Sequence, residues 1–283
     1  MTITPIHDLD DPRLAVYRSL KATNATRDLN CFVVEGEKLV ERLIDSRFPV
    51  ESVLVTDRHL ERMRARIPEG VPVYVAPFEK IHDLVGFPFH RGALACGRRL
   101  APIDWRERWG RGAGPLRFAV CPQISNPENL GSIARLCDAF GFDGLLAGPS
   151  CPDPLSRRVL RVSMGSALRV PIVVVEDLLG LAAEMESVLR VEFFAAVAGD
   201  AEPFEGVPSP ARLGLVLGDE DRGVDPAWVA RCSRSITIPM SGKASSLNVS
   251  TAAAILLYHF SRRDAAPTTP GAPGADAGVE PKP

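Results

Sequence analysis

The chain has 283 residues, of which 46% are hydrophobic and 24% are charged, an ordinary composition for a globular protein. Its net charge of −2 excludes a uniformly basic chain, so the average charge gives no indication of a nucleic-acid-binding protein. No apolar run approaches the roughly 20 residues of a membrane span. Residues 1–14 show no signal peptide, so we expect a cytoplasmic protein without membrane contact.

The six cysteines and five histidines show no metal-binding pattern. No C-x-x-C pair is present, and most of the cysteines lie in apolar surroundings. These features predict buried, reduced thiols rather than disulfides, and they predict no bound metal ion.

The first hundred residues alternate short apolar runs with amphipathic stretches. Strands are expected at 32–36, 52–56, 71–76 and 92–97, and helices at 37–47 and 59–67. Residues 101–115 then lose this periodicity and collect glycine and proline, which predicts a linker. Residues 1–100 are therefore predicted to form a separate small α/β domain.

The remainder of the chain repeats the alternation on a larger scale. Strands are expected at 116–121, 144–148, 171–176, 191–198, 213–218 and 235–240, and helices at 129–140, 155–168, 177–190, 225–232 and 247–262. The strands are continuously apolar, which is typical of a parallel sheet covered on both faces. We predict an α/β domain over residues 116–264 and a disordered tail over 265–283, because the tail has no residues able to form a core.

Three loops that follow predicted strands combine glycines with polar side chains. They lie within residues 122–141, 213–229 and 240–252. Each loop alone has a structural explanation, such as helix capping by an asparagine or serine, or an acidic surface turn. Because the carboxyl ends of parallel strands meet at one edge of a sheet, the three loops together favour a ligand site at that edge.

These loops closely resemble the signature motifs of the SpoU-type (TrmH-like) RNA ribose 2′-O-methyltransferases of the SPOUT class. The N-x-G-x-x-x-R motif matches Asn129, Gly131 and Arg135, and the L-x-L-G-x-E-x-x-G motif matches residues 215–223. The third motif, I-P-M-x-G-x-x-x-S-L-N-V-S-x-A, matches residues 238–252 throughout. Asn126-Pro127 departs from the family, in which many members carry Asp-Pro.

The resemblance implies a fold, an assembly and a cofactor. The fold is a parallel-sheet SPOUT domain with a C-terminal trefoil knot, preceded by an L30e-like substrate-binding domain that FVVEGEKLVERL (32–43) resembles. The assembly is a homodimer with active sites across its interface. The cofactor is S-adenosylmethionine, for which the implied binding residues are Leu217, Gly218, Glu220, Gly223, Ile238, Met240, Leu247 and Asn248.

The resemblance also implies catalytic residues. The catalytic set is Arg135, Asn129, Glu220, Ser246 and Asn248. RNA binding is expected from Arg135 and from the local basic cluster Arg157, Arg158 and Arg161, since an RNA-binding protein needs a basic groove rather than a basic average charge. The family often assigns Arg135 the role of general base. Because a guanidinium has a pKa above about 12, we favour instead a clamp on the neighbouring phosphate that stabilises developing alkoxide charge.

The predicted function is methylation of a ribose 2′-hydroxyl in structured RNA, with ribosomal RNA favoured over tRNA. The alternative is a catalytically inactive RNA-binding or ribosome-associated module on the same fold. Cofactor binding separates the two hypotheses.

Overall fold

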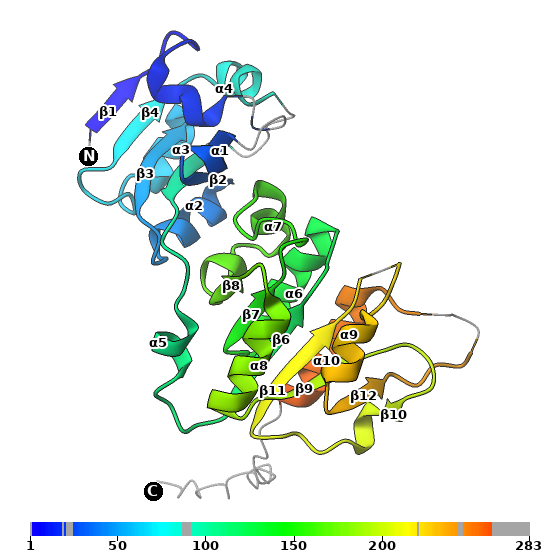
Figure 1. Cartoon of the computed structure of the whole chain (residues 1–283). Coiled ribbons are helices and arrows are strands. Elements are labelled where there is room, and N and C mark those ends of the chain that lie inside the picture. Colours follow the sequence, from blue (N-terminus) through cyan, green and yellow to red (C-terminus); the bar gives the residue numbers. More distant parts are fainter. Residues whose placement is uncertain are drawn as a thin grey trace, which may run out of the picture.

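The computed structural model describes residues 2–18, 20, 25–86, 92–219, 221–242 and 246–261. The tail predicted to be disordered, 265–283, lies outside these residues. Figure 1 shows two layered units, each built on its own sheet and joined by an extended segment. We refer to residues 2–99 as the N-terminal unit and to residues 116–261 as the C-terminal unit.

The N-terminal unit is built on a five-stranded sheet in the order β1-β4-β3-β5-β2. Its strands are β1 (Thr2–Pro5), β2 (Cys31–Glu35), β3 (Val50–Val55), β4 (Pro72–Val75) and β5 (Ala93–Arg98), and its helices are η1 (Pro12–Tyr17), α1 (Ala25–Asp28), α2 (Glu37–Ile44), α3 (Asp57–Met63) and α4 (Phe78–Val85). β5 runs antiparallel to β2 and β3, whereas the remaining pairs are parallel. The predicted strands and helices are present; β1, η1, α1 and α4 were not predicted.

The C-terminal unit is built on a seven-stranded sheet in the order β10-β12-β9-β11-β6-β7-β8, with all pairs parallel. Its strands are β6 (Leu116–Cys121), β7 (Gly144–Ala147), β8 (Ile172–Val174), β9 (Glu192–Ala196), β10 (Glu202–Pro203), β11 (Arg212–Leu217) and β12 (Arg234–Thr237). Its helices are α6 (Pro127–Phe140), α7 (Arg157–Val162), η2 (Ser166–Leu168), α8 (Leu178–Leu189), η3 (Phe204–Gly206), α9 (Pro226–Arg231) and α10 (Val249–Ser261). The predicted parallel α/β fold is confirmed.

Both faces of this second sheet are covered, which explains its continuously apolar strands. Along β6, Ala119 and Cys121 pack into the core beneath α6 and α10, whereas Phe118 and Val120 pack into the core beneath α8 and α9. Successive side chains of a strand point to opposite faces, so each needs its own apolar partner. Burial of this kind also raises the pKa of the Cys121 thiol well above its ordinary value.

The segment predicted to be a linker contains a helix that packs on the C-terminal unit. α5 (Trp105–Trp109) begins after Asp104, whose carboxylate accepts a hydrogen bond from the Arg106 amide at 2.8 Å. Trp105 and Trp109 are both buried in the core beneath α8, and the Trp109 ring meets Phe118 edge-on at 4.8 Å. The linker prediction was wrong in this respect, because the two tryptophans supply an apolar face that the surrounding glycine and proline concealed.

At the amino-terminal edge of the second sheet, buried Arg117 joins three chain segments. Its Nε donates to the Phe260 carbonyl oxygen at 3.0 Å, and its Nη1 donates to the Ala211 carbonyl oxygen at 2.7 Å. Its Nη2 donates to Ser209 Oγ at 3.1 Å. The end of α10, the loop before β11 and the start of β6 are thereby held together.

All six cysteines are free, as reduced thiols require. Within the described ranges, no group of three or more histidine, cysteine, aspartate or glutamate side chains is placed to hold a metal ion. No helix among these residues is both long and apolar enough to cross a membrane.

Candidate active site

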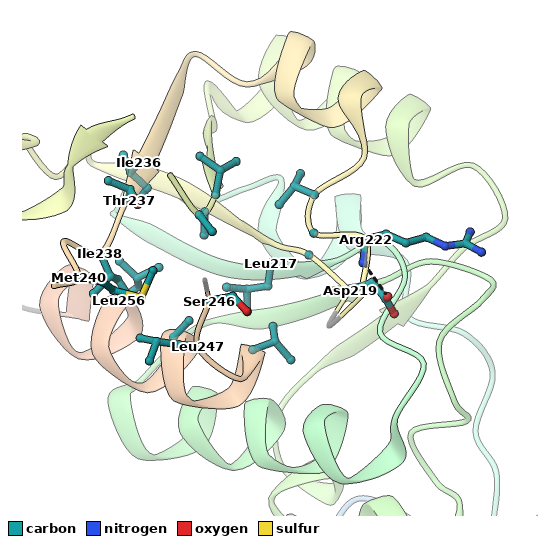
Figure 2. A pocket seen from close by; sticks show the side chains of 18 of the residues that line it. Leu217, Asp219, Arg222, Ile236, Thr237, Ile238, Met240, Ser246, Leu247 and Leu256 are labelled. Carbon is teal, nitrogen blue, oxygen red and sulfur yellow. Dashed lines mark hydrogen bonds between the residues drawn. The ribbon is translucent and has the colours of Figure 1, made fainter. Parts of the chain in front are cut away.

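A cavity of about 410 Å³ opens at the carboxyl ends of β9, β11 and β12. Figure 2 shows its lining, with the chain after β12 and the start of α10 on one side and the loop after β11 on the other. Ligands of open parallel sheets bind at this edge, and the volume lies within the roughly 300–1,000 Å³ typical of small-molecule sites. Two of the three predicted loops therefore form one cavity, and the third, at the start of α6, lies next to them.

The loop after β11 is shaped by two glycines. A Cβ on Gly218 would lie 2.2 Å from the Gly223 carbonyl carbon, so only glycine allows the two backbones to approach. Gly223 has a φ of +69°, which also favours glycine. Asp219 and Gly223 exchange backbone hydrogen bonds of 3.0 and 2.9 Å, and Asp219 Oδ1 accepts the Asp221 amide at 3.0 Å. The Asp219 carboxylate therefore helps to stabilise a tight turn.

The opposite wall is apolar. Ile238 and Met240 follow β12, and Leu247 and Leu256 come from the segment that enters and forms α10. In Figure 2, Ile238, Met240 and Leu256 lie together on one side of the cavity, and Leu217 and Ser246 lie near its centre. Apolar side chains and strand-end backbone groups together can hold a flat heterocycle and hydrogen-bond its edge.

Most of the predicted cofactor residues line this cavity, namely Leu217, Gly218, Gly223, Ile238, Met240 and Leu247. Glu220 lies outside the described residues, so its predicted roles in cofactor binding and catalysis stay predictions. Asn248 does not belong to the described lining, whereas Ser246 does. The predicted catalytic serine therefore lies beside the predicted cofactor residues.

Asn248 connects the third motif to the first. Its Nδ2 donates to Oδ1 of buried Asn129 at 3.2 Å, which joins the start of α10 to α6. Its Oδ1 accepts the Ser250 amide at 2.9 Å and the Ser250 hydroxyl at 2.6 Å. Asn248 thus caps α10 and contacts Asn129 with one side chain. Capping therefore explains part of the polar sequence before α10, and the predicted cofactor-binding and catalytic roles of Asn248 stay predictions.

α6 begins two residues before the predicted helix at 129–140. Asn126 caps it by accepting the Glu128 amide at 2.8 Å, with Pro127 at the first helical position. The asparagine that replaces the family's aspartate therefore still serves as a cap. Arg135, further along α6, is exposed, is absent from the described cavity lining, and makes no hydrogen bond or ion pair with the described residues. The structure does not bring Arg135 into the cavity of its own chain.

The predicted RNA-binding arginines of α7 differ in their surroundings. Arg157 is half-buried and forms an ion pair with Glu35 of β2 at 2.8 Å. Arg158 is exposed and forms an ion pair with Glu128 at 2.7 Å, whereas Arg161 is exposed and has no ion pair with a described residue. Two of the three charges are thus balanced within the chain, and Arg161 is the member most available to a polyanion.

Several residues of the cavity were not found from sequence. They come from the end of β9 (Ala196, Val197 and Ala198), from the β11 loop (Asp221 and Arg222) and from α10 (Val249 and Ala252). The end of the predicted strand at 191–198 was a usable signal, because it meets the same sheet edge. In Figure 2, the Arg222 side chain extends away from the cavity centre, so its backbone rather than its guanidinium lies at the cavity.

Comparison with known families identifies the chain. The model of the SpoU rRNA Methylase family matches residues 117–258, which include all three loops. The chain belongs to this family. Membership confirms the family recognised from the motifs and the prediction that the protein is a methyltransferase. The prediction of S-adenosylmethionine as cofactor is confirmed at the level of the family, whose solved structures include complexes with it.

Relatives with curated names cover nearly the whole of this SpoU family chain. An uncharacterized tRNA/rRNA methyltransferase of Mycobacterium bovis is 33% identical over 270 residues, covering 93% of each chain. The 23S rRNA (guanosine(2553)-2′-O)-methyltransferase of Bacillus subtilis is 26% identical and covers 90% of this chain and 98% of its own. The likeness therefore includes the N-terminal unit.

Solved structures share the fold. The AdoMet-bound rRNA methyltransferase from Sinorhizobium meliloti has a TM-score of 0.77 at 20% identity, covering 91% of this chain and 97% of its own. The SpoU methyltransferase AviRb from Streptomyces viridochromogenes, in complex with AdoMet, has a TM-score of 0.77 at 22% identity, covering 89% and 98%.

Proposed function

We propose that the protein transfers a methyl group from S-adenosylmethionine to a ribose 2′-hydroxyl of structured RNA. The observation that carries this proposal is the cavity at the carboxyl edge of a SpoU-family sheet, lined by residues of two family motifs and adjoined by the third. The Bacillus relative, whose name specifies 2′-O-methylation of 23S rRNA, supports the ribose oxygen as acceptor.

The residues present fit the cofactor. The cavity combines apolar walls, such as Leu217 and Ile238, with backbone groups at strand ends. Leucine and isoleucine side chains would pack against an adenine ring, and backbone amides and carbonyls would pair with its edge. The close approach of Gly218 to Gly223 keeps side-chain atoms out of this part of the wall. Once bound, the cofactor supplies an electrophilic methyl group.

Arg135 is the proposed catalytic residue. Its guanidinium would clamp a phosphate beside the target ribose and stabilise the negative charge that develops on the 2′-oxygen. Ser246, at the cavity, would orient the ribose, and the Asn248–Asn129 hydrogen bond would hold the loop that carries Ser246. The chain then contributes mainly by placing acceptor and donor in line.

Because Arg135 does not enter its own chain's cavity, we infer that the active site is completed in a homodimer. α6 and α10 present an apolar surface on which the Phe140 and Tyr258 rings meet at 5.7 Å. Beside these rings lies a hollow of about 550 Å³, also lined by Phe204 and Ile255. Tyr258 is 49% exposed and lines this hollow, so its ring is available for burial against a second copy.

Sedimentation velocity tests the homodimer. Tyr258→Asp places a charge on this surface and should shift the protein from dimer to monomer, because an unpaired charge is costly to bury. Methylation should fall with it. A monomeric wild-type protein that is fully active would contradict the shared site.

The N-terminal unit is proposed to be the L30e-like RNA-binding domain, and the C-terminal segment to form the trefoil knot. α10 follows β12 yet packs on α6 and β11, which lie on the other side of β9 in the sheet order. This return of the chain to its earlier elements supports the knot proposal. An experimental structure that traces residues 238–249 relative to the loop at 218–223 tests it.

Ribosomal RNA is the proposed substrate, supported by relatives named as 23S rRNA methyltransferases. Labelled S-adenosylmethionine should be offered to total RNA with wild-type protein and with Arg135→Ala. Label that survives alkali as a dinucleotide, and is absent with the variant, supports 2′-O-methylation, and the size of the labelled RNA identifies it. Cofactor binding should be measured by calorimetry in parallel. If no RNA is labelled and no cofactor binding is measured, the result would favour the inactive RNA-binding module.

A further inference from the structure

The two units meet along a seam made by α7 and the loop before it on one side, and by the ends of β2 and β5 with α2 on the other. Figure 1 shows α7 lying between α2 and α6. The segment FVVEGEKLVERL (32–43) contributes most of β2 and α2 to this seam. The proposed RNA-binding and methyl-transfer functions lie on opposite sides of it.

At one end of the seam, Arg99 and Asp153 form a two-pronged ion pair. Arg99 Nη1 donates to Asp153 Oδ1 at 3.1 Å, and Nη2 contacts Oδ2. The pair is well shielded, with side-chain exposures of 15% and 21%. Both side chains are also fixed on their own units, because Arg99 Nε donates to the Cys31 carbonyl oxygen and Asp153 Oδ1 accepts the Leu155 amide. Such geometry sets orientation as well as distance.

Further along the seam, Glu35 and Arg157 form the second pair, at 2.8 Å. The Glu35 side chain is only 6% exposed, so its charge needs a partner to be tolerated. Arg157 supplies that partner from α7. The seam therefore contains two shielded ion pairs, each with its acid and its base on different units.

The seam is also connected to α6. A Cβ on Gly131 of α6 would lie 3.0 Å from the Val159 carbonyl oxygen, so α7 packs on α6 at backbone contact distance. A Cβ on Gly165, just after α7, would lie 3.0 Å from Leu39 and Arg42 of α2. α7 is thus in close contact with β2 of the N-terminal unit and with α6, the helix that carries Asn129 and Arg135, and the turn after α7 contacts α2.

We propose that Glu35 and Asp153, with Arg157 and Arg99, are positioning residues that fix the N-terminal unit relative to α6 and so bring the target ribose to the site. The inference rests on the proposed function, and it gives Arg157 a structural partner in place of an RNA phosphate. A fixed spacing between the surface that binds the RNA and the methyl donor would select which nucleotide is modified.

The test uses the acids rather than the arginines, because the two explanations then predict opposite results. The double variant Glu35→Gln/Asp153→Asn removes the two negative charges of the seam. It keeps the side-chain sizes and the oxygen of residue 153 that accepts the Leu155 amide. If the arginines only attract RNA, freeing them should tighten RNA binding and leave kcat intact. If the pairs position the units, kcat should fall about a hundredfold while affinities for cofactor and RNA are kept.

The matched control is Glu184→Gln/Glu202→Gln. It removes the acids of the Arg106–Glu184 and Arg234–Glu202 ion pairs, which do not cross the seam. Both pairs are exposed: the side-chain exposures are 57% and 50% in the first pair and 43% and 42% in the second. This variant should keep the wild-type kcat. Arg157→Lys, which retains the charge opposite Glu35, should recover most of the activity that Arg157→Gln loses.

Small-angle X-ray scattering of the same proteins provides a readout independent of activity. The seam variant should show a broader distribution of interatomic distances than wild type and control, since the units separate. Unchanged scattering with unchanged kcat would overturn the proposal, as would a loss of kcat that merely follows a loss of cofactor binding. A wild-type protein inactive on all RNA would refute the proposed function, and scattering would still decide whether the seam pairs hold the units.

Discussion

Two arginines of the C-terminal unit, Arg117 and Arg135, have opposite surroundings. At the amino-terminal edge, Arg117 is buried and its guanidinium donates to the carbonyl oxygens of Phe260 and Ala211. On α6, which begins at the carboxyl-terminal edge, Arg135 is exposed, does not belong to the described cavity lining and has no hydrogen-bonding partner among the described residues. One arginine is fully used by the fold, whereas the other remains available to a ligand.

The difference shows that burial and partners, rather than residue type, decide whether the fold uses a side chain. A buried donor left unpaired would cost about 1–3 kcal/mol, so the fold must satisfy Arg117. An exposed arginine keeps its hydration and can exchange it for a phosphate. Arginine-to-lysine substitution at both positions tests this directly, because it preserves the charge and removes only the fork geometry.

Arg135→Lys should give the largest effect, confined to activity. We expect kcat to fall by about 10²–10³-fold, the usual consequence of removing one charge-stabilising donor from an active site. The free energy of unfolding should change by less than about 0.5 kcal/mol, since the side chain is exposed. Steady-state methylation kinetics and urea unfolding measure the two quantities. A lysine variant with full activity would show that a point charge suffices and that the bidentate clamp is wrong.

Arg117→Lys should give the reverse pattern. A lysine cannot reach Phe260, Ala211 and Ser209 together, so carbonyl oxygens at the amino-terminal edge lose their donor. The free energy of unfolding should fall by about 2 kcal/mol, and cofactor affinity should be retained below the unfolding temperature. If Arg117→Lys instead abolished cofactor binding in the folded protein, the separation of the two edges would fail.

Asn248 lies between the two categories, because it both caps α10 and contacts Asn129. Asn248→Ala should lower the free energy of unfolding by about 1 kcal/mol through loss of the cap. Asn248→Asp keeps the oxygen that accepts the Ser250 amide but removes the donor to Asn129. The aspartate variant should therefore have nearly the wild-type free energy of unfolding, but a lower methylation activity than wild type. Wild-type kcat in the aspartate variant would make Asn248 a cap and nothing more.

The sequence predicted those features that depend on residues close together in the chain. The matched motifs contain Gly218 and Gly223, which shape the tight loop, and the same resemblance named Leu217 and Ile238, which line the cavity. Capping of α6 also followed from its sequence, since Asn126 needs only the amides of the next turn.

Long-range contacts could not be predicted in the same way. The antiparallel direction of β5 depends on where the chain re-enters the sheet, which its own residues do not encode. From sequence alone, Glu35 is only the last residue of a strand. Its ion pair with Arg157, which is distant in sequence, could not be predicted. The two tryptophans of α5 were hidden by neighbouring glycines and prolines. The use of a side chain by the fold thus depends on partners that only the structure provides.

The smallest expected effect concerns Asp138, which lies on α6 only three residues beyond Arg135 yet is used by the fold. Burial opposes its ionisation, but hydrogen bonds from Arg169 and Ser166 outweigh it and lower the pKa of the carboxyl below its ordinary 3.8. A lowered folded-state pKa contributes stability above pH 3.8 that is lost as the pH falls below that value. Because Arg169 is largely exposed, the contribution should be small. Urea unfolding at pH 6 and pH 3 should show a smaller acid-induced loss for Asp138→Asn than for wild type, with kcat at neutral pH unchanged. An equal loss in both proteins would mean that the stability of α6 does not depend on this ion pair.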